Sequence, residues 1–192
     1  RTDPPNLCNG QTDAYFSEHV WRLPRTWLSY GGISDAPVPN WRHDEAGVVR
    51  VGSFTNLNKL NPATLALWST VLHALPNGRL LLKNQQLSDD GNRQRILDAM
   101  AAHGIAASRV ELHGSDVTPD WRAHMGYYDR LDIALDPIDV HTGSATTCDT
   151  LWMGVPVITM LGDRMGSRMS ASHLSALGRS EWIARSTQEY VD

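Results

Sequence analysis

Short apolar runs alternate with longer segments of mixed polarity along most of the chain. The runs have the length and composition of buried strands. They cover residues 48–53, 79–83, 109–113, 131–136 and 155–160. Helices are predicted over residues 62–75, 89–103, 118–128 and 168–177, with a shorter one opening near residue 146 and a last one after residue 184. Strands that alternate with helices of about 10–15 residues form a parallel sheet with helices on both faces, so the pattern predicts an α/β, Rossmann-like fold.

Two predicted helix starts contain a proline near the first helical position. Asn61-Pro62 places the proline where no backbone N–H is needed. Thr118 precedes Pro119 in the same way, so Thr118 is expected to cap a helix that reaches about Tyr128. In parallel sheets of this kind, ligands bind beyond the carboxyl ends of the strands, near the point where the strand order reverses. The loops of interest are therefore residues 53–61, 83–88, 113–119, 136–146 and 160–168.

The first part of the chain lacks this regular alternation. A short helix is expected over residues 13–21, with its end at Pro24, and residues 31–47 are rich in proline and glycine. We expect residues 1–47 to form an N-terminal segment and inter-domain linker, and residues 48–192 to form one domain. The chain does not begin with methionine, so we expect a piece truncated at both ends.

The composition is that of a soluble globular protein, with 192 residues, 41% hydrophobic and 20% charged. The net charge of −4 gives no general attraction to nucleic acids or membrane surfaces. No apolar run approaches the ~20 residues of a transmembrane helix, and no signal peptide is visible. Cys8 and Cys148 leave one disulfide open but define no disulfide framework, and His141 with Cys148 lacks further ligands at zinc spacing. The reducing cytoplasm is the expected location.

Residues 143–156 carry the clearest chemical pattern. They follow the predicted strand 131–136 and read as a small-residue loop that opens a helix, with Gly154 as its stop. A helix N-terminus presents unpaired N–H groups and a partial positive charge, which suit a phosphate. One carboxylate about a turn further in is placed for ribose hydroxyls. The hydroxyl donors are Ser144, Thr146 and Thr147, and the carboxylate is Asp149. The pattern predicts a nucleotide site.

Lys59 lies between the first strand and the first long helix, from where a lysine can reach a phosphate across the cleft. Asn56 and Asn58 are candidates for contacts to a base, a sugar or the backbone. The alternative is an exposed lysine in a polar turn. His124 shares a helix face with Trp121, and a structural histidine is the default interpretation before any family argument.

Other polar groups leave more than one interpretation open. Asp132 and Asp136 share a face of one strand and form a carboxylate pair or end-of-strand caps. For Arg164 or Arg168 the alternatives are a contact to a phosphate, a contact to another domain, and ion pairs on the surface. The chain lacks the G-x-G-x-x-G fingerprint, a Walker loop, a G-x-S-x-G elbow and an H-E-x-x-H motif.

Four motifs in order resemble the O-linked N-acetylglucosamine transferase and SPINDLY family. They are residues 52–62, 132–136, 146–157 and 167–172. The resemblance implies the C-terminal, donor-binding half of a GT-B glycosyltransferase. It further implies inverting transfer of a sugar from a nucleotide to protein Ser or Thr hydroxyls, without an obligatory metal or other cofactor. Tetratricopeptide repeats and the N-terminal catalytic half are then expected outside this chain.

The same resemblance assigns roles to the candidate residues. Lys59 would hold the diphosphate and stabilise the leaving group, with Asn56 near the same phosphates. Thr146 and Thr147 would contact the diphosphate at the helix start, where Ser144 adds a further hydroxyl. Asp149 would bind the ribose, and His124 would lie beside the base and the diphosphate.

Two departures from the family pattern affect the choice of donor. Ser144-Ala145 replaces the more usual residues of the loop, and the loop from Asp136 is one residue longer. UDP-GlcNAc is the expected donor, but some SPINDLY-type members use GDP-fucose. The alternatives are therefore an O-fucosyltransferase, another GT-B enzyme such as an epimerase or a glycan-building transferase, and a non-catalytic nucleotide-binding or scaffold module. This piece alone is expected to be inactive.

Overall fold

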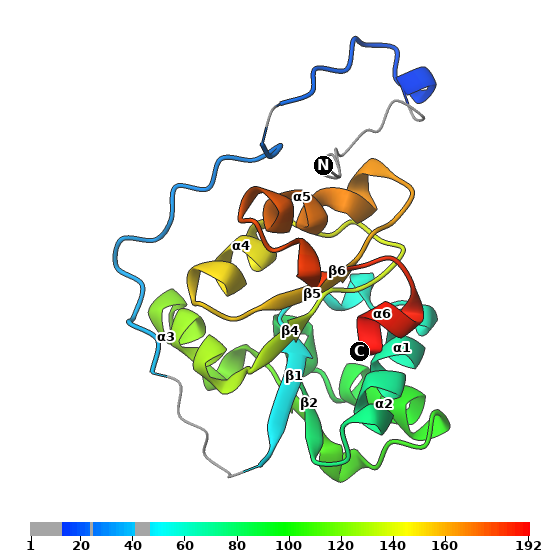
Figure 1. Cartoon of the computed structure of the whole chain (residues 1–192). Helices are drawn as coiled ribbons and strands as arrows, with labels where there is room; N and C mark the ends of the chain where they lie inside the picture. The colour runs from blue at the N-terminus through cyan, green and yellow to red at the C-terminus, as the bar shows by residue number, and fades with distance from the viewer. Residues whose placement is uncertain (1–12, 24, 41–46) are drawn as a thin grey trace.

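The computed structural model describes residues 13–23, 25–40 and 47–192. Within them, six parallel strands form one sheet in the order β3-β2-β1-β4-β5-β6 (Figure 1). The strands are β1 Val49–Ser53, β2 Gly78–Lys83, β3 Val110–His113, β4 Ile133–Leu135, β5 Val157–Met160 and β6 Ile183–Ala184. The helices are α1 Pro62–Ala74, α2 Asp90–Ala102, α3 Trp121–Gly126, α4 Ala145–Trp152, α5 Met169–Ala176 and α6 Thr187–Val191. The α/β, Rossmann-like prediction is confirmed.

The strand order reverses between β1 and β4. The chain moves outward from β1 to β2 and β3, then returns to place β4 on the other side of β1. Val51 pairs with Ile133 and Gly52 with Ala134, so the carboxyl ends of these two central strands lie side by side. The loops after β1 and β4 therefore meet at the switch point, where doubly wound sheets bind their ligands.

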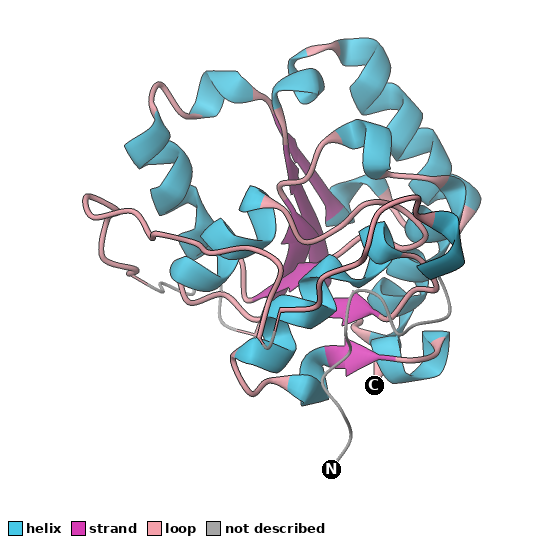
Figure 2. Cartoon of the chain, turned by 90° about the horizontal axis from the view of Figure 1, so that it is seen from above, coloured by secondary structure: helices cyan, strands magenta, loops and turns pink. Residues whose placement is uncertain are grey.

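Helices cover both faces of the sheet (Figure 2). One face packs against α1, α2 and α6, whose buried side chains include Trp68, Leu72, Met100 and Tyr190. The other packs against the α3 region and the segment after α4, with Met125, Tyr128 and Met153 at its centre. Leu80 and Leu82 of β2 belong to the first core and Leu81 to the second, as the alternation of side chains along a strand requires.

The N-terminal segment comprises residues 13–23, which extend beyond α5, and residues 25–40, which pass along the outside of α5, α4 and α3 (Figure 1). Thr26 contacts α5 through the Nδ1 atom of His173 at 3.0 Å, and Asn40 donates its backbone N–H to Asp129 at 3.0 Å. Cys8, Pro24 and residues 41–46 of the expected linker lie outside the described residues. The expected helix over residues 13–21 is wrong, because only Asp13–Tyr15 forms a single 3₁₀ turn.

Local capping explains which helix boundaries were predictable. Asn61 accepts a hydrogen bond from the backbone N–H of Thr64 at 2.7 Å, and Pro62 opens α1 as expected. The predicted start at Thr118 is wrong. Asp120 caps α3 instead, by accepting from the backbone N–H of Ala123 at 2.8 Å. An aspartate two positions further along provides the stronger cap, so the helix begins later than the proline suggests.

No helix in the described part of the chain is both long enough and apolar enough to cross a bilayer.

Candidate functional site

A small polar cavity lies at the switch point of the sheet, where the loops after β1 and β4 meet. Its volume is about 20 Å³, which is close to the space for one water molecule, so its polar groups form a floor rather than a deep pocket. The residues that carry its polar side chains are Ser53, Thr55, Lys59, Asp136, Thr142, Ser144, Thr146, Thr147 and Thr150. The lysine loop and the hydroxyl-rich loop singled out in the sequence therefore converge on one place.

Lys59 is held at this cavity by a tight turn. Leu57–Lys59 forms a 3₁₀ turn that Asn56 caps, because its side-chain oxygen accepts from the backbone N–H of Asn58 at 2.9 Å. Asn56 is exposed and uses its carbonyl oxygen on the turn, so only its amide NH₂ can reach a ligand. Asn61 then donates from its side chain to the carbonyl of Ile138 at 2.8 Å, which ties the start of α1 to the loop after β4.

Helix α4 points its N-terminus at the same cavity. Ser144 is the N-cap residue but makes no side-chain capping bond, so its hydroxyl is not used on the helix. Thr146 is half-buried, whereas Thr147 is buried and lies 3.2 Å from the Ser170 hydroxyl. The helix start thus presents backbone N–H groups and two less buried hydroxyls, an arrangement suited to an anion.

The two carboxylates of the β4 segment have separate roles. Asp132 accepts a hydrogen bond from the backbone N–H of Arg50 in β1 at 2.7 Å, so its carboxylate has a structural role in the sheet. Asp136 is buried at the cavity and accepts from the Thr159 hydroxyl at 2.8 Å. Burial raises the pKa of Asp136 to about 6, although hydrogen bonds and the nearby Lys59 charge act in the opposite direction. They do not form one catalytic pair.

Asp136→Asn is expected to stabilise the fold at neutral pH. Because the folded pKa of Asp136 lies above its unfolded value, its contribution to stability is fully present below about pH 4 and is lost as the pH rises through about 6. The asparagine does not titrate, so the stability of the variant relative to the wild type should rise by about 3 kcal/mol between about pH 4 and about pH 8. Urea unfolding at both pH values measures this difference. A gain that is equal at both would contradict it.

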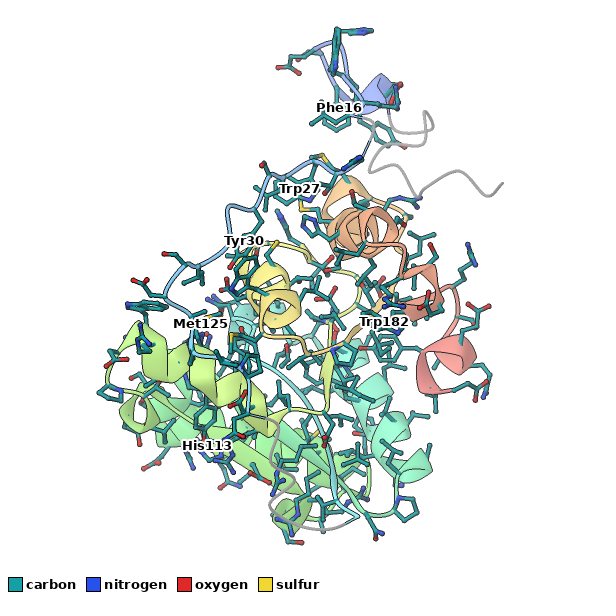
Figure 3. The ribbon with its side chains drawn as sticks, turned by 60° about the vertical axis from the view of Figure 1, so that its left-hand side comes forward. Phe16, Trp27, Tyr30, His113, Met125 and Trp182 are labelled. Carbon is teal, nitrogen blue, oxygen red and sulfur yellow. The ribbon has the colours of Figure 1, made fainter. Side chains whose placement is uncertain are left out.

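Asp149, the expected ribose ligand, contacts the N-terminal segment. Its carboxylate accepts from the Tyr30 hydroxyl at 2.6 Å, and the Tyr30 ring meets the Trp152 ring edge-on. Burial, followed by the Asp149 contact, raises the pKa of Tyr30. Figure 3 shows Tyr30 beside α4 and Trp27 beside α5 on this segment. The sequence pattern did not single out Tyr30, because nothing local pairs it with a helix more than a hundred residues away.

His124 has a basic partner that the sequence analysis also missed. Its Nδ1 atom lies 2.7 Å from the Nζ atom of Lys83, the last residue of β2. Lys83 is buried, and its Nζ lies 5.8 Å from the centre of the Phe54 ring and 5.5 Å from that of Tyr127. Burial lowers the pKa of Lys83; burial and the Lys83 charge lower that of His124. One feature of the sequence could have pointed to Lys83: it ends β2, the strand beside β1, at the edge of the sheet where ligands bind.

The remaining candidates lie away from the cavity or support the backbone. Arg164 pairs with Asp163 at 3.6 Å on an exposed loop, and Arg168 donates to the carbonyl of Gly162 at 2.7 Å. His141 is exposed. Buried Cys148 lies 3.8 Å from the Nε2 atom of His173, and burial raises the pKa of its thiol. Within the described ranges, no group of three or more His, Cys, Asp or Glu side chains is arranged to hold a metal ion.

A larger cavity, of about 350 Å³, lies under the N-terminal segment and shares none of its lining residues with this polar floor. Apolar side chains of the segment, including Phe16, Trp21 and Trp27, form much of its wall, and Met165 and Ser172 complete the lining. Figure 3 labels Phe16 and Trp27 on this segment. Its lining lacks the converging hydroxyl and lysine groups of the smaller cavity, so size does not identify the chemical site here.

The fold matches a solved glycosyltransferase closely. A mutant O-GlcNAc transferase of Thermobaculum terrenum superposes with a TM-score of 0.87 and 33% sequence identity, over 97% of this chain and 34% of that one. Together with the strand order and the switch-point site, this match defines the C-terminal, Rossmann-like half of a GT-B glycosyltransferase.

The sequence model of glycosyl transferase family 41 matches residues 41–192, and the chain belongs to that family. A rice (Oryza sativa subsp. japonica) protein described as "Probable UDP-N-acetylglucosamine--peptide N-acetylglucosaminyltransferase SPINDLY" is 35% identical over 190 residues, 98% of this chain and 20% of the rice protein. A Caenorhabditis elegans UDP-N-acetylglucosamine–peptide N-acetylglucosaminyltransferase is 30% identical over 140 residues, 72% of this chain and 12% of that protein. The chain thus spans about a fifth of the length of the SPINDLY relatives it matches.

Proposed function

We propose that this chain is the nucleotide-sugar-binding part of an inverting, metal-independent protein O-glycosyltransferase that transfers GlcNAc from UDP-GlcNAc to Ser or Thr hydroxyls. The observation that carries the proposal is the convergence of Lys59 and the N-terminus of α4 on one polar cavity at the switch point. The division into a segment over residues 1–47 and a donor-binding domain over residues 48–192 belongs to this proposal, as does a cytoplasmic location.

The chemistry follows from the charge that develops when the sugar leaves. A departing nucleoside diphosphate gains negative charge, and preorganised donors stabilise it most when they need not move. Lys59 supplies a cation to the diphosphate, and Ser144, Thr146 and the backbone N–H groups of α4 supply neutral donors. One lysine and a helix N-terminus can take the role that a metal ion has in other sugar transferases.

The sugar and ribose contacts lie around this centre. Asp149 would accept from the ribose hydroxyls, which requires the Tyr30 hydroxyl to share or release the carboxylate. His124 would lie beside the base and the diphosphate, and Asn56 would contribute its amide NH₂. The acceptor protein and the general base would be held by the N-terminal catalytic half of the enzyme, with tetratricopeptide repeats before it, so this chain alone would be inactive.

A GDP-fucose-dependent O-fucosyltransferase is the second candidate. The SPINDLY relatives match at up to 35% identity over 98% of this chain, against 30% over 72% for the C. elegans protein. The Ser144-Ala145 pair at the start of α4 also departs from the usual loop of the family. The higher identity and coverage favour a SPINDLY-like donor site, the departure at Ser144-Ala145 leaves the donor open, and the cavity geometry does not select the base.

Calorimetric titration with UDP, GDP and ADP tests the proposal and separates the two candidates. A preference for UDP supports GlcNAc transfer, and a preference for GDP supports fucose transfer. Lys59→Ala should lower the affinity for the preferred nucleotide by about tenfold to a hundredfold, because a charge-assisted contact is lost. Arg164→Ala, which removes an exposed charge, is the matched control and should bind like the wild type. Failure of both this chain and the parent enzyme to bind any of the three would refute the proposal.

A further inference from the structure

We propose that Lys83 is a positioning residue that holds His124 as a neutral imidazole with its proton on Nε2, ready to donate a hydrogen bond to a nucleoside diphosphate. The ligand part of this inference rests on the proposed function, whereas the state of the imidazole does not. The inference starts from the 2.7 Å contact between the Lys83 Nζ and His124 Nδ1 atoms.

Lys83 is built into the protein at a place where an ammonium group has few partners. Its side chain is 5% exposed at the carboxyl end of β2. The rings of Phe54 and Tyr127 lie 5.8 and 5.5 Å from Nζ, distances at which aromatic faces attract a cation. Among the described residues, no carboxylate forms an ion pair with Lys83, so His124 supplies its hydrogen-bond acceptor.

The contact fixes the protonation pattern of both groups. An ammonium has three donors and no lone pair, so Nζ can only donate and Nδ1 of His124 must accept. A neutral imidazole with an accepting Nδ1 carries its proton on Nε2. A second positive charge on His124 would lie 2.7 Å from the first, and burial penalises it further, so the pKa of His124 falls.

The groups around His124 come from four parts of the fold. Lys83 belongs to β2, Phe54 follows β1, and Tyr128 follows α3, with its ring edge-on to the imidazole. Asp149 on α4 acts against Lys83, because its negative charge favours the imidazolium. Burial and Lys83 outweigh it, since the pKa of His124 is lowered overall.

This arrangement gives the site a neutral donor with a fixed cation behind it. The Nε2–H group can donate to a phosphate oxygen or a base carbonyl, and the Lys83 charge polarises the imidazole in the direction of that donation. Nucleotide affinity then does not require protonation of His124, so His124 should add no pH dependence of its own between about pH 6 and about pH 8, beyond that set by Asp136 at the cavity and by the terminal phosphate. An imidazolium donor would instead lose affinity over this interval.

Nitrogen-15 NMR of the histidine side chains in the full 192-residue chain, without nucleotide, tests the imidazole state directly. His124→Gln assigns the signal. The wild-type spectrum should show an accepting Nδ1 and a protonated Nε2 through neutral pH. A protonated Nδ1 at neutral pH would overturn the inference, and this measurement needs no variant of Lys83.

Lys83→Met keeps the length of the side chain and removes the charge. It should raise the pKa of His124 and mix the two tautomers, because the Lys83 charge that disfavours the imidazolium is lost. Lys83→Arg, which still donates, should restore the single tautomer. Arg122→Met, at an exposed site on the same helix as His124, should change neither property. An unchanged His124 in Lys83→Met would also overturn the inference.

Titration of the same variants with the preferred nucleotide separates this inference from the proposed function. If Lys83 positions a donor, Lys83→Met should weaken binding about tenfold and add the titration of His124 to the pH dependence of the wild type, and Lys83→Arg should recover most of the affinity. If no nucleotide binds the wild type while the imidazole state is as expected, the proposed function fails and the positioning role of Lys83 stands.

Discussion

Lys59→Ala is expected to lower kcat for sugar transfer by the parent enzyme at least about a hundredfold. Removal of one preorganised donor from a developing negative charge costs this much in other enzymes, and a cation beside a departing diphosphate contributes at least as much as a neutral donor. The expected change lies in kcat more than in KM, because the charge on the leaving group is greatest in the transition state.

The structure explains why another residue does not replace Lys59. The Leu57–Lys59 turn is closed by the bond from the Leu60 N–H to the Leu57 carbonyl at 3.0 Å and capped by Asn56, so the backbone of Lys59 is fixed at the cavity. Lys83 is buried against His124 and does not line this cavity.

Asn58→Ala is the control for Lys59→Ala, because Asn58 is exposed in the same turn and does not line the cavity. It should keep kcat within about twofold of the wild type. Steady-state assays of the parent enzyme with matched thermal unfolding curves measure both effects. If Lys59→Ala folds normally and keeps kcat, then Lys59 is a surface residue of a polar turn and the leaving group is stabilised elsewhere.

Gly143→Ala is expected to destabilise the protein by about 3 kcal/mol or more. Gly143 has φ +67°, a conformation that a residue with a Cβ atom adopts only at a cost. A Cβ atom there would lie 2.2 Å from the Ser170 backbone nitrogen and 2.4 Å from the Met169 carbonyl carbon. Both are backbone atoms at the start of α5, so they cannot rotate away as a side chain can, and overpacking adds its own cost.

The same substitution should also weaken nucleotide binding. The Gly143 carbonyl lies 2.8 Å from Nε2 of His173, and the next residue, Ser144, caps α4. A shift of this backbone therefore moves the helix N-terminus that faces the cavity. Gly31→Ala is the matched control, because Gly31 lacks a positive φ and a Cβ there would have no atom within 4 Å. Urea unfolding and nucleotide titration measure both effects, and a Gly143→Ala protein within 0.5 kcal/mol of wild type would show that the loop can move.

Local patterns were enough to predict five of the six strands and much of the polar loop arrangement, but not the two-residue strand β6. A strand that is buried on both faces requires consecutive apolar residues. The run Leu80-Leu81-Leu82 meets this requirement, because its side chains alternate between the two cores of the sheet. Asn61 and Pro62 define a helix start through bonds to the next turn. Lys59 and the 144–147 loop follow strand ends, and the rule for ligand sites in parallel sheets brings them together without coordinates. The choice between two nearby N-cap residues was harder to predict: Thr118 was expected to cap α3, but Asp120 does so.

The sequence by itself determined the α/β class, the family resemblance and the phosphate-facing candidates, because each depends on residues close together in the chain. Only the tertiary structure decided what those candidates touch. Lys83 meets His124 across 41 positions, Tyr30 meets Asp149 across 119, and His173 meets Gly143 across 30. Such contacts depend on how the helices pack on the sheet. They join residues that are far apart in the sequence, so local propensities cannot predict them. The charge state of His124 and the placement of α4 are therefore properties of the folded chain.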